Sequence, residues 1–140
     1  MIDLRKKQKN QTRIRCIAYL CATGDLYSIE KNENKQFRYL NDYASAHGID
    51  ICKVIRRNGM AQAVINEHWK IMAEMIKKGV ADGILIANTE AVSTCVSDSF
   101  FKIGQVYEVG GVVVTVDEGR LGMPIRRMKN GRMVLVNEKY

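Results

Sequence analysis

Apolar runs of strand length alternate with segments of helical periodicity, and this alternation constrains the fold more than any other feature of the chain. The expected strands occupy residues 14–22, 49–55, 83–87 and 111–116. The first is apolar almost throughout (IRCIAYLCA), as in a strand that is covered on both faces. The last, GVVVTV, is rich in the β-branched residues that strands favour.

Between these runs, apolar residues recur at the spacing of one helix face. The first predicted helix lies within 29–47 and ends at Gly48, and the second ends at Gly79. The third follows the strand at 83–87, with Ser97 or Asp98 as its expected N-cap. The stripes consist of Phe37, Leu40, Ala44 and His47, then Ile65, Trp69, Met72, Ala73 and Ile76, then Phe100, Ile103, Gly104 and Tyr107.

Strands that alternate with helices predict an α/β fold built from βαβ units. We expect a three-layer arrangement, with a mainly parallel sheet of about four to five strands and helices on both faces. The end of the chain differs, because Asn130-Gly131 is a type I′ turn signal between two short runs. Residues 125–129 and 132–136 are therefore predicted to form a C-terminal β-hairpin. The expected organisation is a basic arm at 1–12, one domain at 13–122 and a tail at 123–140.

The charge of the chain favours polyanionic partners. Its formal net charge is +7, and basic residues concentrate near both ends. Such a balance favours non-specific electrostatic contact with nucleic acid, although no aromatic residues are interleaved to stack on bases. The candidate nucleic-acid contacts are Arg56 and Arg57 after the second strand, and Arg120, Arg126 and Arg127 near the end of the chain.

Other compositional signals exclude several classes. No apolar run approaches the roughly 18–20 residues that span a bilayer, and the basic N-terminus lacks an apolar signal-peptide core, so we expect a cytoplasmic protein with no membrane partner. The four cysteines form no CxxC pair, and the two histidines lie at no metal-ligand spacing from them. We therefore expect buried free thiols, no metal and no cofactor.

In an open α/β sheet, ligands bind beyond the carboxyl ends of the strands. The functional residues are therefore expected in the loops after Ala22, Ile55, Ala87 and Val116. These loops include Thr23-Gly24-Asp25, where a hydroxyl follows directly on a buried strand.

In this order, the loops resemble those of the serine recombinase catalytic domain, the resolvase/invertase family. The family ends its first strand in Tyr-x-Arg-x-Ser, and the matching stretch here runs from Tyr19 to Thr23. After its third strand the family carries Asp-Arg-Leu-x-Arg, which corresponds to Glu90, Ala91, Val92, Ser93 and Thr94. Gly110 to Gly119 is similar to the family's fourth strand and the turn after it.

The resemblance implies a resolvase-like fold and phosphoryl transfer, with Thr23 at the position of the family's nucleophile. The transition state of that reaction needs positioned positive charge, which arginine supplies best. Here the family's arginines correspond to Cys21, Ala91 and Thr94, and the stretch 66–68 lacks the arginine of the family's second helix. The resemblance therefore implies a domain of a DNA recombination system, such as a regulator or relic of a mobile element, that is catalytically inactive and acts by protein or weak DNA contacts.

Two alternatives stay open at this stage. The chain could cleave DNA strands with Thr23, aided by charge from Arg56 and Arg57. It could instead be a small α/β module that binds an anion or nucleotide, with Gly24 and Asp25 as the cradle, although it has no Gly-rich fingerprint. A second copy of the chain is another candidate partner, and the edge of the terminal hairpin is a candidate contact for it.

Overall fold

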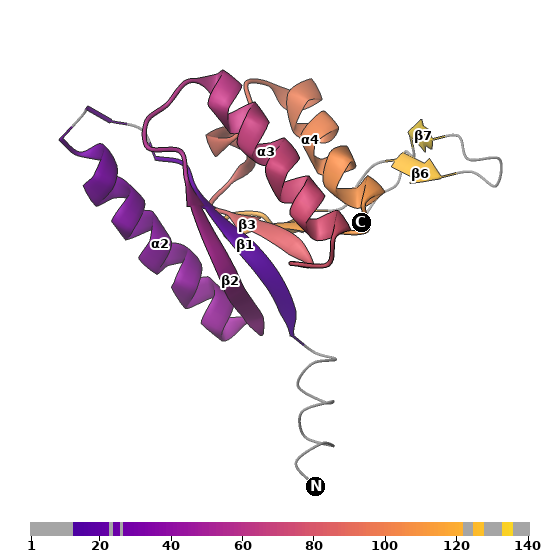
Figure 1. Cartoon of the computed structure of the whole chain (residues 1–140), viewed down its shortest axis with the longest axis horizontal. Helices are drawn as coiled ribbons and strands as arrows, with labels where there is room; N and C mark the ends of the chain where they lie inside the picture. The colour runs from indigo at the N-terminus through magenta and orange to yellow at the C-terminus, as the bar shows by residue number, and fades with distance from the viewer. Residues whose placement is uncertain (1–12, 23, 26, 122–124, 128–132, 136–140) are drawn as a thin grey trace, which may run out of the picture.

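The computed structural model describes residues 13–22, 24–25, 27–121, 125–127 and 133–135, and its centre is a twisted sheet (Figure 1). The sheet has five strands in the order β2-β1-β3-β4-β5. The first four run parallel, and β5 pairs antiparallel with β4. The strands are β1 (Ile14–Leu20), β2 (Ile49–Arg56), β3 (Gly83–Ile86), β4 (Val112–Thr115) and β5 (Gly119–Leu121).

Helices cover both faces of this sheet, as the alternation of elements predicts (Figure 1). One face packs against α2 (Ile29–Ala46), and the other against α3 (Gln62–Lys77) and α4 (Val96–Glu108). Strand β1 supplies both cores, because successive side chains of a strand point to opposite faces. Ile17 and Tyr19 pack with Trp69 on the side of α3 and α4, while Ala18 and Leu20 face the other way.

Two parallel strands approach each other closely at Gly83. A Cβ atom at this position would lie 2.5 Å from the carbonyl oxygen of Val112. Only glycine therefore fits where β3 begins its pairing with β4. This pairing places the loops after β3 and β4 side by side at the carboxyl edge of the sheet.

The start of α4 differs from the prediction. The helix begins at Val96 with Cys95 as its N-cap, so Ser97 and Asp98 both lie inside its first turn. The side chain of Asp98 instead accepts a hydrogen bond from Nζ of Lys102 at 2.6 Å. Lys102 is only 3% exposed, and a buried ammonium group requires such a partner. The expected N-cap was therefore wrong, because Asp98 is bound to a residue one helical turn later.

Two further features were not predicted. Strand β5 follows a tight turn after β4, and a short 3-10 helix, η1 (Thr89–Ala91), follows β3.

The prediction of buried thiols holds for Cys16 and Cys21 but is wrong for Cys52 and Cys95, which are exposed. Cys52 lies on the edge strand β2, and Cys95 is the N-cap of α4.

The C-terminal hairpin is confirmed within the described residues. Strands β6 (Ile125–Arg127) and β7 (Met133–Leu135) pair antiparallel as a separate two-stranded sheet. Residues 128, 129, 132 and 136 of the predicted hairpin lie outside the described part of the chain. Among the described residues, no helix is both long and apolar enough to cross a membrane.

Candidate functional site

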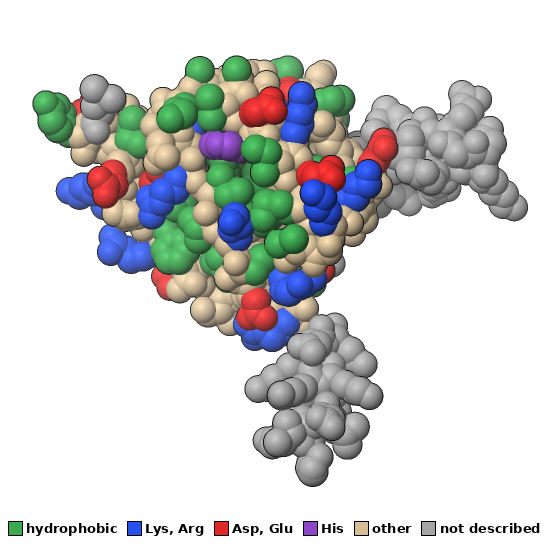
Figure 2. Space-filling view, viewed as in Figure 1, with side chains coloured by type: hydrophobic (Ala, Val, Ile, Leu, Met, Phe, Trp, Pro, Cys, Tyr) green, Lys and Arg blue, Asp and Glu red, His purple; other side chains and the backbone are tan. Residues whose placement is uncertain are grey.

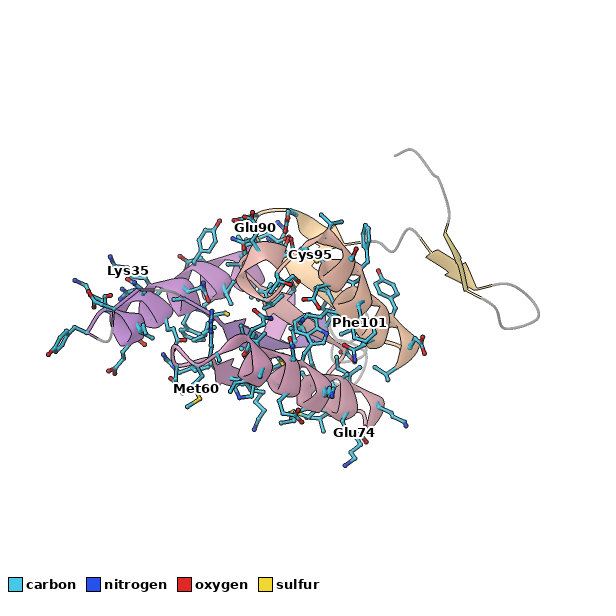
Figure 3. All side chains as sticks on the ribbon, turned by 90° about the horizontal axis from the view of Figure 1, so that it is seen from above. Lys35, Met60, Glu74, Glu90, Cys95 and Phe101 are labelled. Carbon is cyan, nitrogen blue, oxygen red and sulfur yellow. The ribbon has the colours of Figure 1, made fainter. Side chains whose placement is uncertain are left out.

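A polar groove lies at the carboxyl edge of the sheet, where the sequence places the functional residues. Its volume is about 640 Å³, and it opens between α2 and the residues that follow β1, β3 and β4. In Figure 3, Lys35 marks its α2 side and Glu90 the side of η1. Its lining residues include Cys21, Ala22, Gln36, Tyr39, Asn88, Ala91 and Asp117.

Cys21 forms one wall of the groove and joins two of the predicted loops. Its Sγ donates a hydrogen bond to the carbonyl oxygen of Ala91 at 2.7 Å. Its backbone N–H donates to Oε1 of Gln36 on α2 at 2.6 Å. The end of β1 is thereby held to both sides of the groove. Burial raises the pKa of the Cys21 thiol, so this group donates a hydrogen bond as a neutral thiol.

Arg57 brings a positive charge beside the side chain of Cys21. The strand end is aligned by the backbone N–H of Arg57, which donates to the carbonyl oxygen of Leu20. Its guanidinium Nη1 lies 3.7 Å from Sγ of Cys21, and its Nε donates to the carbonyl oxygen of Met60 at 2.6 Å. An arginine that directly follows β2 therefore lies beside the position where the resemblance expects an arginine from β1.

Arg56 is occupied by a different set of partners. Its Nη1 lies 3.7 Å from Oε1 of Glu33, a residue of α2 that is fully buried. Its Nη2 donates to Oδ1 of Asn34 at 3.0 Å. The other carboxylate oxygen of Glu33 accepts from the backbone N–H of Asn58. Arg56 thus compensates a buried charge inside the domain, which is a structural role.

Carboxylates dominate the far wall of the groove. Asp117 accepts hydrogen bonds from the Tyr39 hydroxyl at 2.5 Å and from the Asn88 amide at 3.0 Å. These donors lower the pKa of Asp117, so the group stays ionised at neutral pH. Glu90 adds a second carboxylate, and Lys35 is the one cation among the described residues that line the groove.

The loop after β1 has its own internal partners. Gly24 has a φ of 143°, and Oδ1 of Asp25 accepts hydrogen bonds from the backbone N–H groups of Tyr27 and Ser28. These bonds lower the pKa of Asp25. The N–H groups that would cradle an anion at the start of α2 therefore already bind a carboxylate.

His68 is packed rather than placed in the groove. Its Nδ1 lies 2.8 Å from the hydroxyl of Tyr19, and the two rings meet edge to face. Burial raises the pKa of the Tyr19 hydroxyl. This pair ties α3 to β1 on the sheet face opposite α2.

The structure brings together some of the predicted site residues and separates others. Cys21, Glu90 and Ala91 line the groove, whereas Thr94 is exposed and does not line it. Thr23 lies outside the described residues. The side chains of Arg120, Arg126 and Arg127, in β5 and β6, also lie outside the described part.

Sequence reasoning missed the polar side chains that α2 contributes. Gln36 and Tyr39 lie in the groove, but on the sequence they are ordinary polar-face residues of a helix. The position of Asn88 and Asp117 could be predicted, because both belong to loops that were expected at this edge of the sheet. Among the described residues, His, Cys, Asp and Glu form no cluster of three or more that could hold a metal ion.

No protein-family model and no curated protein matches the sequence. Among solved structures, the N-terminal catalytic domain of TP901-1 integrase superposes with a TM-score of 0.60 at 15% identity, over 75% of this chain and 78% of that one. A resolvase family site-specific recombinase from Streptococcus pneumoniae gives 0.62 at 15% identity, over 76% and 74%.

A third structure has the same architecture. The C-terminal catalytic domain of ISC1926 TnpA, an IS607-like serine recombinase, superposes with a TM-score of 0.59 at 16% identity, over 74% of this chain and 70% of that one. The sequence resemblance and the three superpositions agree. The chain has the fold of a serine recombinase catalytic domain.

Proposed function

We propose that this chain is a recombinase-like domain of a DNA recombination system that does not cleave DNA and acts in the cytoplasm through protein contacts or weak DNA contacts. The observation that carries the proposal is the contact between Cys21 and Ala91. These residues correspond to two arginines of the recombinase motifs, and neither can bind a phosphate oxygen as arginine does. The proposal assigns the recombinase-like domain to residues 13–122.

The electrostatics of the groove support the same conclusion. Phosphoryl transfer spreads negative charge over the phosphate oxygens, and removing one well-placed donor costs about 10²–10³ in rate. In this groove Asp117 and Glu90 present negative charge instead. The guanidinium of Arg56 is held by Glu33 and Asn34.

One observation favours the alternative of strand cleavage by Thr23. Arg57 lies beside Cys21, and its guanidinium has more donors than the two contacts described above use. To reach a phosphate in the groove, this side chain would have to leave the carbonyl oxygen of Met60. A single arginine would then have to stabilise the transition-state charge that several arginines stabilise in the recombinase motifs.

The bonds that Asp25 makes to Tyr27 and Ser28 argue against the anion-binding module. An anion at this loop would have to displace an ionised carboxylate from the N–H groups it occupies. The carboxylate itself would repel the incoming charge.

Covalent capture tests the proposal directly. The chain is incubated with a pool of supercoiled plasmids that carry random inserts, quenched with denaturant and probed for protein-linked DNA ends. The wild type is compared with Thr23→Ala, Arg57→Ala and the matched control Ser28→Ala, and an active resolvase with its own site validates the assay. We expect no adduct from any variant of this chain.

Adducts that disappear in Thr23→Ala and persist in Ser28→Ala would overturn the proposal and establish Thr23 as a nucleophile. Their loss in Arg57→Ala as well would assign the activating charge to Arg57. The thermal unfolding of each variant is measured in parallel, so that an unfolded protein is not counted as inactive.

A further inference from the structure

An apolar groove separates α3 from α4 on the side of these helices that faces solvent. Its volume is about 480 Å³, and its apolar lining includes Ala73, Phe100, Phe101 and Val109. Phe101 is 65% exposed and Phe100 40%. Figure 2 shows hydrophobic side chains gathered over these two helices, with charged side chains around them. Large aromatic side chains in such a patch are typical of an interaction surface.

The charged residues beside this groove are arranged with opposite signs on its two helices. Lys70 and Lys77 lie on α3, and Glu108 lies on α4. Glu74, also on α3, pairs with Lys78 of its own helix at 4.0 Å. Within the described residues, neither Lys77 nor Glu108 takes part in an ion pair. The α3 rim is therefore positive and the α4 rim negative.

We propose that this groove binds a second copy of the same chain about a two-fold axis that runs along the helices. Helix α3 connects the parallel strands β2 and β3, and α4 connects the parallel strands β3 and β4. Both helices therefore run opposite to the strands and in the same direction as each other (Figure 1). Rotation by half a turn about an axis parallel to them places each α3 over the partner's α4. The positive rim of one copy then meets the negative rim of the other on both sides of the axis.

A two-fold axis across the helices would give the opposite result. It would place α3 on α3 and α4 on α4, so that like charges would face each other. Because like-charge contacts disfavour association, the charge pattern selects the first arrangement. The second copy fits this surface better than an arbitrary apolar partner, since it supplies both the aromatic side chains and the complementary charges.

The spacing of residues along the two helices supports this pairing. Lys77 and Glu108 lie at the same end of the groove, near the C-termini of their helices. Two helical turns before them, Lys70 on α3 corresponds to Phe101 on α4. In the proposed dimer, Lys77 pairs with the Glu108 position of the other copy, while Lys70 lies over the ring of Phe101, a cation–π arrangement.

This interface does not depend on whether the domain cleaves DNA. The apolar groove is formed by α3 and α4, whereas the polar groove is formed by α2 and the strand ends. Figure 3 shows Phe101 and Glu74 on neighbouring helices, and Lys35 on the separate helix α2. A cleavage-competent chain and an inactive one could therefore dimerise in the same way.

Charge exchange provides the sharpest test. Sedimentation velocity of the full chain over a wide concentration range gives the dimer dissociation constant. Lys77→Glu and Glu108→Lys should each weaken the dimer by about tenfold or more, because each places like charges together. The double variant restores opposite charges and should return the constant close to that of the wild type. The matched control, Lys53→Glu on β2, should have no effect.

A monomeric wild type at all concentrations would overturn the proposal. A double variant whose dimer dissociation constant stays as high as those of the single variants would overturn the proposed pairing of the two helices. Phe101→Ser gives an independent measure, and it should weaken the dimer by about tenfold or more. Tyr27→Ser removes an aromatic side chain that is 95% exposed on another surface and should leave the dimer unchanged. If Phe101→Ser and Tyr27→Ser weakened the dimer equally, the result would contradict the proposed site.

Discussion

Sγ of Cys21 and the carbonyl oxygen of Ala91 are 2.7 Å apart, so the end of β1 and the η1 turn after β3 meet directly in the wall of the polar groove. Cys21 is only 4% exposed, and Arg57 lies on its other side. The position therefore accommodates a small neutral side chain between a carbonyl group and a guanidinium. A second guanidinium at this position would lie next to that of Arg57.

We predict that restoring the arginine of the recombinase motif at this position destabilises the domain. Cys21→Arg would place a long cation next to Arg57 at a buried site, with a cost of at least about 2 kcal/mol in the free energy of unfolding. Urea denaturation measures this cost. Cys95→Arg, at an exposed cysteine, serves as the control and should change the stability little. Equal stability of the two variants would show that the site can open to accept arginine.

Arg56 gives a second prediction, because it compensates a buried carboxylate. Arg56→Met leaves Glu33, which is fully buried, with the N–H of Asn58 as its remaining described donor. We expect a loss of about 2–3 kcal/mol in the free energy of unfolding, with allowance for the partial exposure of Arg56.

The control for this prediction is Arg13→Met, which breaks the exposed pair of Arg13 with Asp50. Such exposed pairs contribute little to the free energy of unfolding. If Arg56→Met cost no more than this control, the Glu33 carboxylate would not depend on Arg56, and Arg56 would be free for other contacts.

Much of the fold could be predicted from the sequence because its signals are local. The run at 14–22 and the stripe around Trp69 are long and regular, and both form the expected element. The N-cap of α4 could not be predicted in this way. Asp98 is a good N-cap residue in isolation, but its side chain accepts a hydrogen bond from the buried ammonium group of Lys102, one turn later in the same helix. The burial of Lys102 depends on tertiary packing, which the local pattern does not show.

The site was predictable in its position but not in its contacts. Loop order alone placed Cys21, Ala91 and Asp117 at one edge of the sheet. The partners of these residues depend on the three-dimensional packing of α2, which carries Gln36 and Tyr39 into the groove. The pairing of Arg57 with Cys21 depends on the register of β2 against β1. Neither relationship leaves a signal in the sequence.

The bond between Tyr39 and Asp117 predicts a pH dependence. Hydrogen bonds lower the pKa of Asp117 in the folded state, so the unfolded state binds more protons at acidic pH. This contribution to stability is present above the ordinary aspartate pKa of about 3.9 and is lost as the pH falls through the folded value. Tyr39→Phe should raise the pKa of Asp117 and make the acid-induced loss of stability shallower.

Carboxyl carbon NMR titration measures this pKa in the wild type and in Tyr39→Phe. Tyr43→Phe is the matched control, because Tyr43 stacks on His47 and makes no described contact with Asp117. A pKa of Asp117 that is unchanged in Tyr39→Phe would mean that the amide of Asn88 alone maintains the ionised form.

DNA binding should depend on the basic arm at 1–12 more than on the folded surface. If Lys6 and Lys7 neutralise phosphates, replacing both with glutamine should reduce the slope of log affinity against log salt by roughly 2, since each contact contributes about 0.9. Fluorescence anisotropy with a random-sequence duplex, titrated at several salt concentrations, gives this slope. Lys31→Gln with Lys53→Gln removes the same charge from exposed positions on α2 and β2 and should leave the slope nearly unchanged. An equal reduction in both variants would show that affinity follows net charge alone, and that the arm makes no particular contact with DNA.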